Sequence, residues 1–285
     1  PLPPLFSLFT TAQEYKPSDC SPPPEDHPDN DTREKMDFGS REALMELLKQ
    51  KQVRLLRPEW VLEWRKTHPG RGLPRRQEIP AHAFLDPDTV TEAQWKDLLV
   101  ISVSYCWVTK QHPDPEGYHL ATLAAMLTKL MAGSAEAGKD REYFDPASGR
   151  KIQGSNIIAA DSHLFGAAGG RVVGIFVDWS CLPQHPRTGA EQALFDACLR
   201  DINVFYAHSE TMVWLLTSLP KHVKRAAYDA SGWPFFERAV ACLISRSFYV
   251  LCIDAEARAK LLRGGEGRAA AAGERGGRRR RRRGG

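Results

Sequence analysis

Three short segments of the chain carry side chains that could do chemistry, namely Ser104–Trp107, Asp178–Gln184 and Gly232–Glu237. Each combines aromatic rings with hydroxyl, thiol or carboxyl groups. A carboxylate in a partly dry cleft stabilises the positive charge of an oxocarbenium-like transition state and can hold ribose hydroxyls. The segments therefore contain the groups that a nucleotide-binding or nucleotide-cleaving site needs.

Four residues of these segments are candidates for substrate binding, and each has a structural alternative. Asp178 could accept a hydrogen bond from a ribose, or it could cap the loop that follows it. Tyr105 and Trp107 could line a nucleotide pocket, although packing is the commoner role of such aromatic residues. Trp233 could stack on a ring or close the cleft, or it could anchor the start of a helix in the core.

Other reactive residues give no comparable pattern. Cys106 and Cys181 have no histidine and partner carboxylate in an evident arrangement, which disfavours a thiol nucleophile. The histidines are scattered at no ligand spacing, so we expect no metal site. Gly166–Gly170 lacks the Lys-Ser/Thr pair of a phosphate loop and precedes a strand. We therefore expect no resident cofactor.

The elements that must position these residues follow one another in a regular order. Continuous apolar runs predict buried parallel strands at Leu98–Tyr105, Val172–Trp179, Met212–Thr217 and Phe248–Asp254. Apolar stripes at helical spacing predict helices at Leu120–Leu130, Ala190–Tyr206, Ser231–Ser245 and Ala255–Arg263. This alternation predicts an α/β fold, an open and mostly parallel sheet with helices on both faces and ligands at the carboxyl ends of its strands.

The remaining segments differ from this α/β domain in composition. We expect a disordered Pro/Asp-rich leader (1–38), a small helical extension and connector (39–97), the α/β domain (98–263) with a Gly-rich insertion (133–170), and a disordered Arg/Gly-rich tail (264–285). The chain begins at Pro1 without a methionine, as a fragment or a processed product would.

Composition excludes several classes of protein. Of the 285 residues 42% are hydrophobic, too many for a wholly disordered chain, and no apolar run approaches the ~20 residues of a membrane span. Six cysteines are too few for a disulfide scaffold, so we expect an intracellular, cytoplasmic protein. The net charge of +4 comes from the tail, so nucleic acid is not an expected partner except weakly through its arginines.

The three segments resemble, in order, the signature blocks of the heterokaryon incompatibility (HET) domain. The first block reads roughly Ser-Tyr-x-Trp-Gly, and Ser104–Trp107 matches it, with Val108 at the glycine. The second reads Asp-x-x-Cys-Ile-Asn-Gln, of which Asp178–Gln184 keeps the Asp, Cys and Gln. The third reads Arg-Gly-Trp-x-x-x-Glu, of which Gly232–Glu237 keeps the Gly, Trp and Glu.

HET domains are in turn similar to Toll/interleukin-receptor (TIR) domains, which have a flavodoxin-like strand order and a Trp-Cys-x-x-Glu helix start. Trp233 and Glu237 have that spacing, with Pro234 in place of the cysteine. Many TIR domains cleave the bond between nicotinamide and ribose in NAD, so the resemblance implies that Glu237 is the catalytic acid. The alternative is that Glu237 is a first-turn glutamate favoured by the helix dipole.

The resemblance leaves two functional hypotheses from different classes. The first is an enzyme that takes NAD or a related nucleotide as substrate and acts as a cell-death or defence effector. The second is a non-catalytic module of the same fold that forms homo-oligomers through the α/β domain. The two differ in their need for Glu237, because an enzyme needs this residue beside a pocket with Asp178 and an aromatic ring.

Overall fold

The computed structural model describes residues 41–131, 142–145, 150–153, 172–208, 211–244 and 249–263, which lie in one compact unit, Asp37–Gly285. The predicted leader and tail, and most of the predicted insertion, lie outside the described residues. The described helices are α1 (Arg41–Lys49), α2 (Pro58–Thr67), α3 (Glu92–Lys96), α4 (Tyr118–Met131), α7 (Asp178–Cys181), α8 (Gly189–Asp201), α9 (Val204–Ala207), α10 (Gly232–Ile244) and residues 255–263. The described strands are β1 (Leu99–Tyr105), β2 (Glu142–Asp145), β3 (Arg150–Gln153), β4 (Val173–Phe176), β5 (Thr211–Leu216) and β6 (Val250–Ile253).

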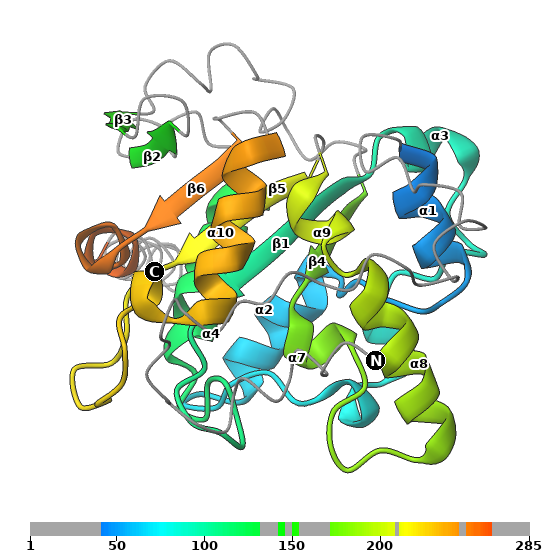
Figure 1. Cartoon of the computed structure of the whole chain (residues 1–285), viewed down its shortest axis with the longest axis horizontal. Helices are drawn as coiled ribbons and strands as arrows, with labels where there is room; N and C mark the ends of the chain where they lie inside the picture. Colours follow the sequence, from blue (N-terminus) through cyan, green and yellow to red (C-terminus); the bar gives the residue numbers. More distant parts are fainter. Residues whose placement is uncertain are drawn as a thin grey trace, which may run out of the picture. The chain divides into compact units, whose positions relative to one another are not determined.

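The described strands form one six-stranded sheet in the order β3-β2-β6-β5-β1-β4 (Figure 1). The four strands predicted from apolar runs are β1, β4, β5 and β6, and they pair in parallel. The α/β fold class is therefore confirmed. Of these four strands, β4 follows β1 in the chain and lies on one side of it, whereas β5 and then β6 lie on the other side. This is the flavodoxin-like order, and the direction in which strands are added changes between β1 and β5. Ligands of such sheets bind at the carboxyl ends of the strands that flank this reversal.

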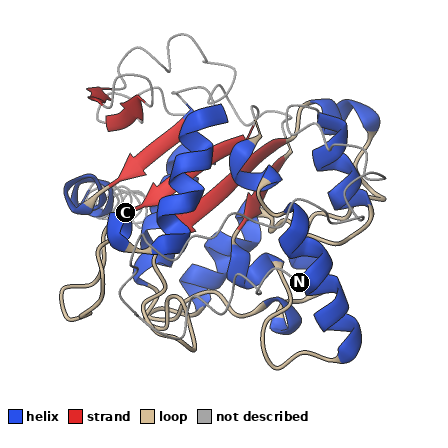
Figure 2. Cartoon of the chain, in the orientation of Figure 1, coloured by secondary structure: helices blue, strands red, loops and turns tan. Residues whose placement is uncertain are grey.

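Helices cover both faces of the sheet (Figures 1 and 2). Helices α9 and α10 cross the face nearest the viewer in Figure 1, and α4 and α2 pack together on the far side. Strand β1 is buried along its whole length, which explains its continuous run of apolar residues. Its residues alternate between the faces. Ser102 and Ser104 face α9 and α10, whereas Val103 and Tyr105 line a pocket with residues of α4.

The structure differs from the sequence-based expectation in three elements. Part of the predicted insertion forms β2 and β3, which add an antiparallel pair to the edge of the sheet beside β6. The predicted helix Ala190–Tyr206 is divided into α8 and α9. A single amphipathic helix buries only one stripe of side chains along its length. All four residues of α9 are buried, so α9 cannot simply continue the amphipathic helix α8. Asp178 opens the one-turn helix α7 instead of ending a strand.

The N-terminal extension is tied to the outer edge of the parallel strands. Leu56 and Ile175 exchange two backbone hydrogen bonds of 2.9 Å, so the extension pairs with β4 at this point. The connector that follows buries Phe84 and Trp95. Its short helix α3 begins with a capping box, in which Thr91 and Gln94 exchange hydrogen bonds. Residues 41–97 therefore contribute to the core that supports β4.

We expect Phe176→Ala to lower the free energy of unfolding by about 3–5 kcal/mol. The Phe176 ring is fully buried at the end of β4 and stacks on Phe205 of α9, with ring centroids 4.5 Å apart. Its removal leaves a cavity between the sheet and α9. Urea denaturation of the full chain measures the loss, and Phe235→Ala, which removes a ring that is 56% exposed, is the matched control. Equal effects of the two substitutions would contradict the assignment of Phe176 to the core.

Candidate functional site

The carboxyl group of Glu237 lies at the centre of a buried polar network beside the carboxyl end of β1. Glu237 is in the second turn of α10, and only 3% of the residue is exposed. Its carboxyl accepts hydrogen bonds from the hydroxyls of Ser104 and Tyr206 and from the indole of Trp233. Ser104 also shares a hydrogen bond with the hydroxyl of Tyr228. The alternative of a first-turn glutamate favoured by the helix dipole does not describe this position, which lies in the second turn.

Burial, together with the negative charge of Asp178, raises the pKa of Glu237 to about 8. The hydrogen bonds from Ser104, Tyr206 and Trp233 oppose this shift, because they stabilise the ionised form. At neutral pH the carboxyl is therefore mostly protonated. A carboxyl with a pKa near the working pH can exchange a proton in either direction, which is what general acid–base chemistry requires.

Asp178 brings together two of the other predicted residues. Its carboxyl accepts hydrogen bonds of 3.1 Å from the Tyr105 hydroxyl and of 3.1 Å from the Trp107 indole. It also accepts a 2.7 Å bond from the backbone N–H of Trp179. Burial raises the pKa of Asp178, and these three hydrogen bonds oppose the shift. Asp178 and Trp107 both remain partly exposed, so this end of the site can be reached from solvent.

Trp233 connects the buried network to the surface. It is the second residue of α10, it is partly exposed, and its indole donates to Glu237. Its ring also lies beside Phe236, with centroids 5.8 Å apart. All five predicted site residues thus lie near the carboxyl ends of β1 and β4 or at the start of α10. The structure places Trp233 against the candidate carboxyl, and Tyr105 and Trp107 against Asp178.

Sequence reasoning missed two hydroxyls and a basic loop. Tyr206 and Tyr228 supply buried hydroxyls to the network, and nothing in their local sequence distinguishes them from core tyrosines. The loop after β5 exposes Lys221, Lys224 and Arg225 at the carboxyl edge of the sheet. The clustering of these basic residues directly after a buried strand was a usable signal.

The structure does not support a thiol nucleophile at Cys106 or Cys181. Both thiols are buried, and burial raises the pKa of Cys181 to about 12. Burial also raises the pKa of Cys106, although its hydrogen bond with Ser231 and the charge of Arg225 oppose the shift. His119 hydrogen-bonds to the backbone oxygen of Cys106 at 3.1 Å and not to its sulfur. A thiolate nucleophile is therefore disfavoured at both positions.

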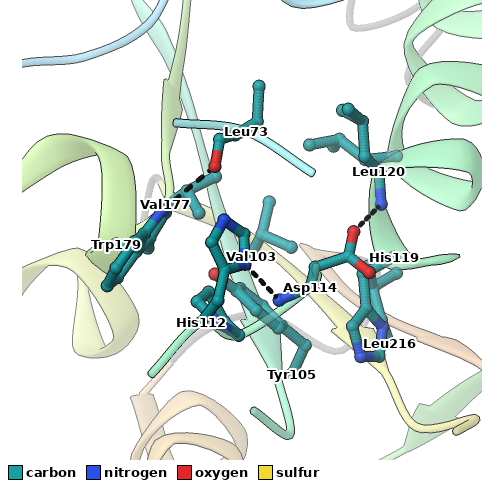
Figure 3. Close-up of a pocket in the computed structure, with 12 residues that line it drawn as sticks. Leu73, Val103, Tyr105, His112, Asp114, His119, Leu120, Val177, Trp179 and Leu216 are labelled. Carbon is teal, nitrogen blue, oxygen red and sulfur yellow. Dashed lines mark hydrogen bonds between the residues drawn. The ribbon is translucent and has the colours of Figure 1, made fainter. Parts of the chain in front are cut away.

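The other face of β1 borders a small pocket with room for about one water molecule (Figure 3). The Tyr105 ring belongs to both regions, because it lines this pocket while its hydroxyl reaches Asp178. The pocket is lined by Leu73, Val103, Tyr105, His112, Pro113, Asp114, His119, Leu120, Leu123, Val177, Trp179 and Leu216.

Within the described ranges, no three His, Cys, Asp or Glu side chains are grouped so that they could hold a metal ion. None of the described helices has both the length and the apolar character needed to cross a membrane.

Comparison of the chain with protein-family models, with curated proteins and with solved structures finds no significant match. Function is therefore inferred from the residues and geometry of the site.

Proposed function

We propose that this chain is a HET/TIR-like protein that cleaves NAD or a related nucleotide at the N-glycosidic bond, as an intracellular cell-death or defence effector. The observation that supports this best is the carboxyl of Glu237, whose pKa is about 8, at the strand-order reversal of a flavodoxin-like sheet. Asp178, Tyr105, Trp107 and Trp233 accompany it. The described cysteines are all free, which fits a reducing compartment.

The proposed reaction transfers the ribose of NAD to water. The bond between ribose C1′ and the pyridinium nitrogen breaks, its electron pair goes to the nitrogen, and neutral nicotinamide leaves. The ribose then carries the positive charge, which the ionised carboxylate of Glu237 stabilises. Water adds to C1′ and its proton goes to the carboxylate of Glu237, so ADP-ribose forms. A purine leaving group would need a proton, which the protonated form of Glu237 could donate.

The loop after β5 supports a substrate that carries phosphate. Lys221, Lys224 and Arg225 are exposed at the carboxyl edge of the sheet, and the charge of Arg225 lowers the pKa of Cys106, the residue after Tyr105. Positive charge around a cleft raises the local concentration of anionic ligands. The remainder of the fold is close to neutral, so this loop is a local feature and not part of a general basic surface.

The burial of Glu237 implies that the described state is closed. With 3% of the residue exposed, the carboxyl cannot touch a substrate until a neighbouring group moves. The indole of Trp233 is hydrogen-bonded to Glu237 and is partly exposed. Displacement of this side chain would therefore open the carboxyl of Glu237 to a substrate. Assembly of several chains would then be the event that opens the site, consistent with an effector that is inactive as a monomer.

Incubation of the concentrated full chain with NAD tests the proposal, with nicotinamide release followed by chromatography. We expect nicotinamide and ADP-ribose in equal amounts. Other nucleotides with an N-glycosidic bond are tested alongside, because the proposal covers related substrates. A folded, self-associated chain that releases no base from any of them would contradict the enzyme and leave the second candidate.

The second candidate is a non-catalytic module that self-associates, and the outer face of α10 favours it. Four large apolar residues of this helix are exposed: Phe235, Phe236, Leu243 and Ile244. Exposed apolar residues gathered on one helix are typical of a protein–protein contact. The same helix carries Glu237 on its buried side, so the two candidates share one element.

We expect Leu243→Glu to shift the chain from assemblies to monomers, since Leu243 is 82% exposed and a charge there opposes burial in a contact. Sedimentation velocity over a range of protein concentrations measures the change. The matched control is Ala193→Glu, which adds the same charge at an exposed position of α8. A wild-type chain that stays monomeric at every concentration, or an identical shift in both variants, would rule out this surface.

A further inference from the structure

The pocket on the α4 side of β1 contains two buried polar atoms that have no hydrogen-bond partner among the described residues. Asp114 and His119 are 5% and 3% exposed, and both line the pocket. One carboxyl oxygen of Asp114, Oδ2, accepts a 2.8 Å bond from the backbone N–H of Leu120, while Oδ1 has no partner. The Nε2 atom of His119 bonds to the backbone oxygen of Cys106 at 3.1 Å, while Nδ1 has no partner.

Both unpartnered atoms are hydrogen-bond acceptors. The backbone oxygen of Cys106 can only accept, so the hydrogen of the His119 ring must be on Nε2, and Nδ1 presents a lone pair. Burial lowers the pKa of His119, which keeps the ring neutral. The free carboxyl oxygen of Asp114 is likewise an acceptor. A buried acceptor without a donor lowers the stability of the folded state. A ligand that fills this pocket must therefore donate at least two hydrogen bonds.

The rest of the pocket sets the size and charge of that ligand. The space is that of about one water molecule and is partly open to solvent. Aromatic rings of Tyr105, His112 and Trp179 line it (Figure 3). The backbone of Leu120 is the one donor the structure gives the Asp114 carboxyl, and no side-chain cation of the described residues forms an ion pair with it. A compact cation with several hydrogens meets all of these conditions, because aromatic faces also attract cations.

We propose that this pocket binds the head of a primary ammonium ligand, R–NH₃⁺, which donates hydrogen bonds to Asp114 Oδ1 and His119 Nδ1. The head group is no larger than the water-sized space, and its organic substituent extends through the open side. A trapped water could donate the same two hydrogen bonds but would leave the carboxylate without a counter-charge. The site lies on the face of β1 opposite Ser104 and Glu237, so it does not depend on the function proposed above.

Isothermal titration calorimetry of the full chain with ethylammonium chloride at pH 7 tests the proposal. Sodium chloride at equal ionic strength gives the baseline, ethanol supplies a neutral group of similar size, and tetramethylammonium supplies a cation without N–H donors. We expect ethylammonium to bind at least about tenfold more tightly than either comparison ligand, the ratio that 1.4 kcal/mol of binding free energy produces. Binding that is absent, or equal for all three, would overturn the proposal.

A matched pair of variants separates the pocket from the surface. Asp114→Asn keeps an oxygen for the N–H of Leu120 and replaces the unpartnered acceptor with an amide that donates, so we expect ethylammonium binding to weaken at least about tenfold. Asp88→Asn removes an exposed carboxyl that pairs with Lys51 and should leave binding unchanged. Far-UV circular dichroism checks that both variants fold. If a folded Asp114→Asn variant keeps wild-type affinity, the proposed site is wrong.

Discussion

Glu237→Gln is expected to lower the rate of nicotinamide release from NAD at least about 100-fold, because the amide can neither ionise nor transfer a proton. The loss should appear in kcat more than in KM, since the carboxylate stabilises charge that develops only in the transition state. The substitution removes little from the folded state. The glutamate is mostly protonated at neutral pH, and glutamine has nearly the shape of that neutral acid. Steady-state kinetics with nicotinamide chromatography measures the effect.

Glu256→Gln is the control for this experiment. It makes the same chemical change at an exposed glutamate that pairs with Lys260 in the last described helix. We expect wild-type activity from this variant. An active wild type together with an equally active Glu237→Gln variant would remove Glu237 from the chemistry while leaving the fold assignment intact. Equal loss in both variants would point to a general effect on the preparation.

The contribution of Glu237 to the stability of the folded chain should fall as pH rises from about 5 to 8. The pKa of Glu237 is about 8 in the folded state and near its ordinary value of 4.5 when unfolded. Between these values the folded chain keeps a proton that the unfolded chain releases, so rising pH favours unfolding. The contribution of Glu237 should fall by up to about 1.4 kcal/mol per pH unit and level off above the folded pKa.

Urea denaturation of the wild type and of Glu237→Gln at four pH values between 5 and 8.5 measures this contribution as a difference. His119 and Asp178, whose pKa values burial also shifts, are present in both proteins, so subtraction removes most of their effect. We expect the glutamine variant to gain stability relative to the wild type as pH rises. A difference that does not change with pH would mean that Glu237 titrates normally and is open to solvent.

The sequence predicted the parallel strands well because β1 and β5 are buried along their whole length and consist mostly of apolar residues. It did not predict β2 and β3, because these are short strands within a segment rich in Gly, Ala and Ser. It also gave one helix for α8 and α9. Apolar periodicity marks which residues face inward, but it carries little information about a change of helix axis.

The candidate site was predictable only where its residues follow strand ends or begin a helix. Asp178, Tyr105 and Trp107 lie in segments that a parallel sheet must bring together at one edge. Tyr206 and Tyr228 could not be found in this way, because their hydroxyls reach Glu237 and Ser104 through tertiary packing alone. The raised pKa of Glu237 is equally invisible in sequence, since it comes from burial.

The side chains of β1 point alternately to the two faces of the sheet, and this restricts how the protein can change during evolution. Ser104 serves the network around Glu237, and its neighbours Val103 and Tyr105 serve the pocket on the opposite face. Inserting or deleting one residue within β1 would exchange these side chains between the faces and disrupt both regions at once. Relatives of this chain should therefore vary in the composition of β1 but not in its length, and length changes should gather in the loops at its ends.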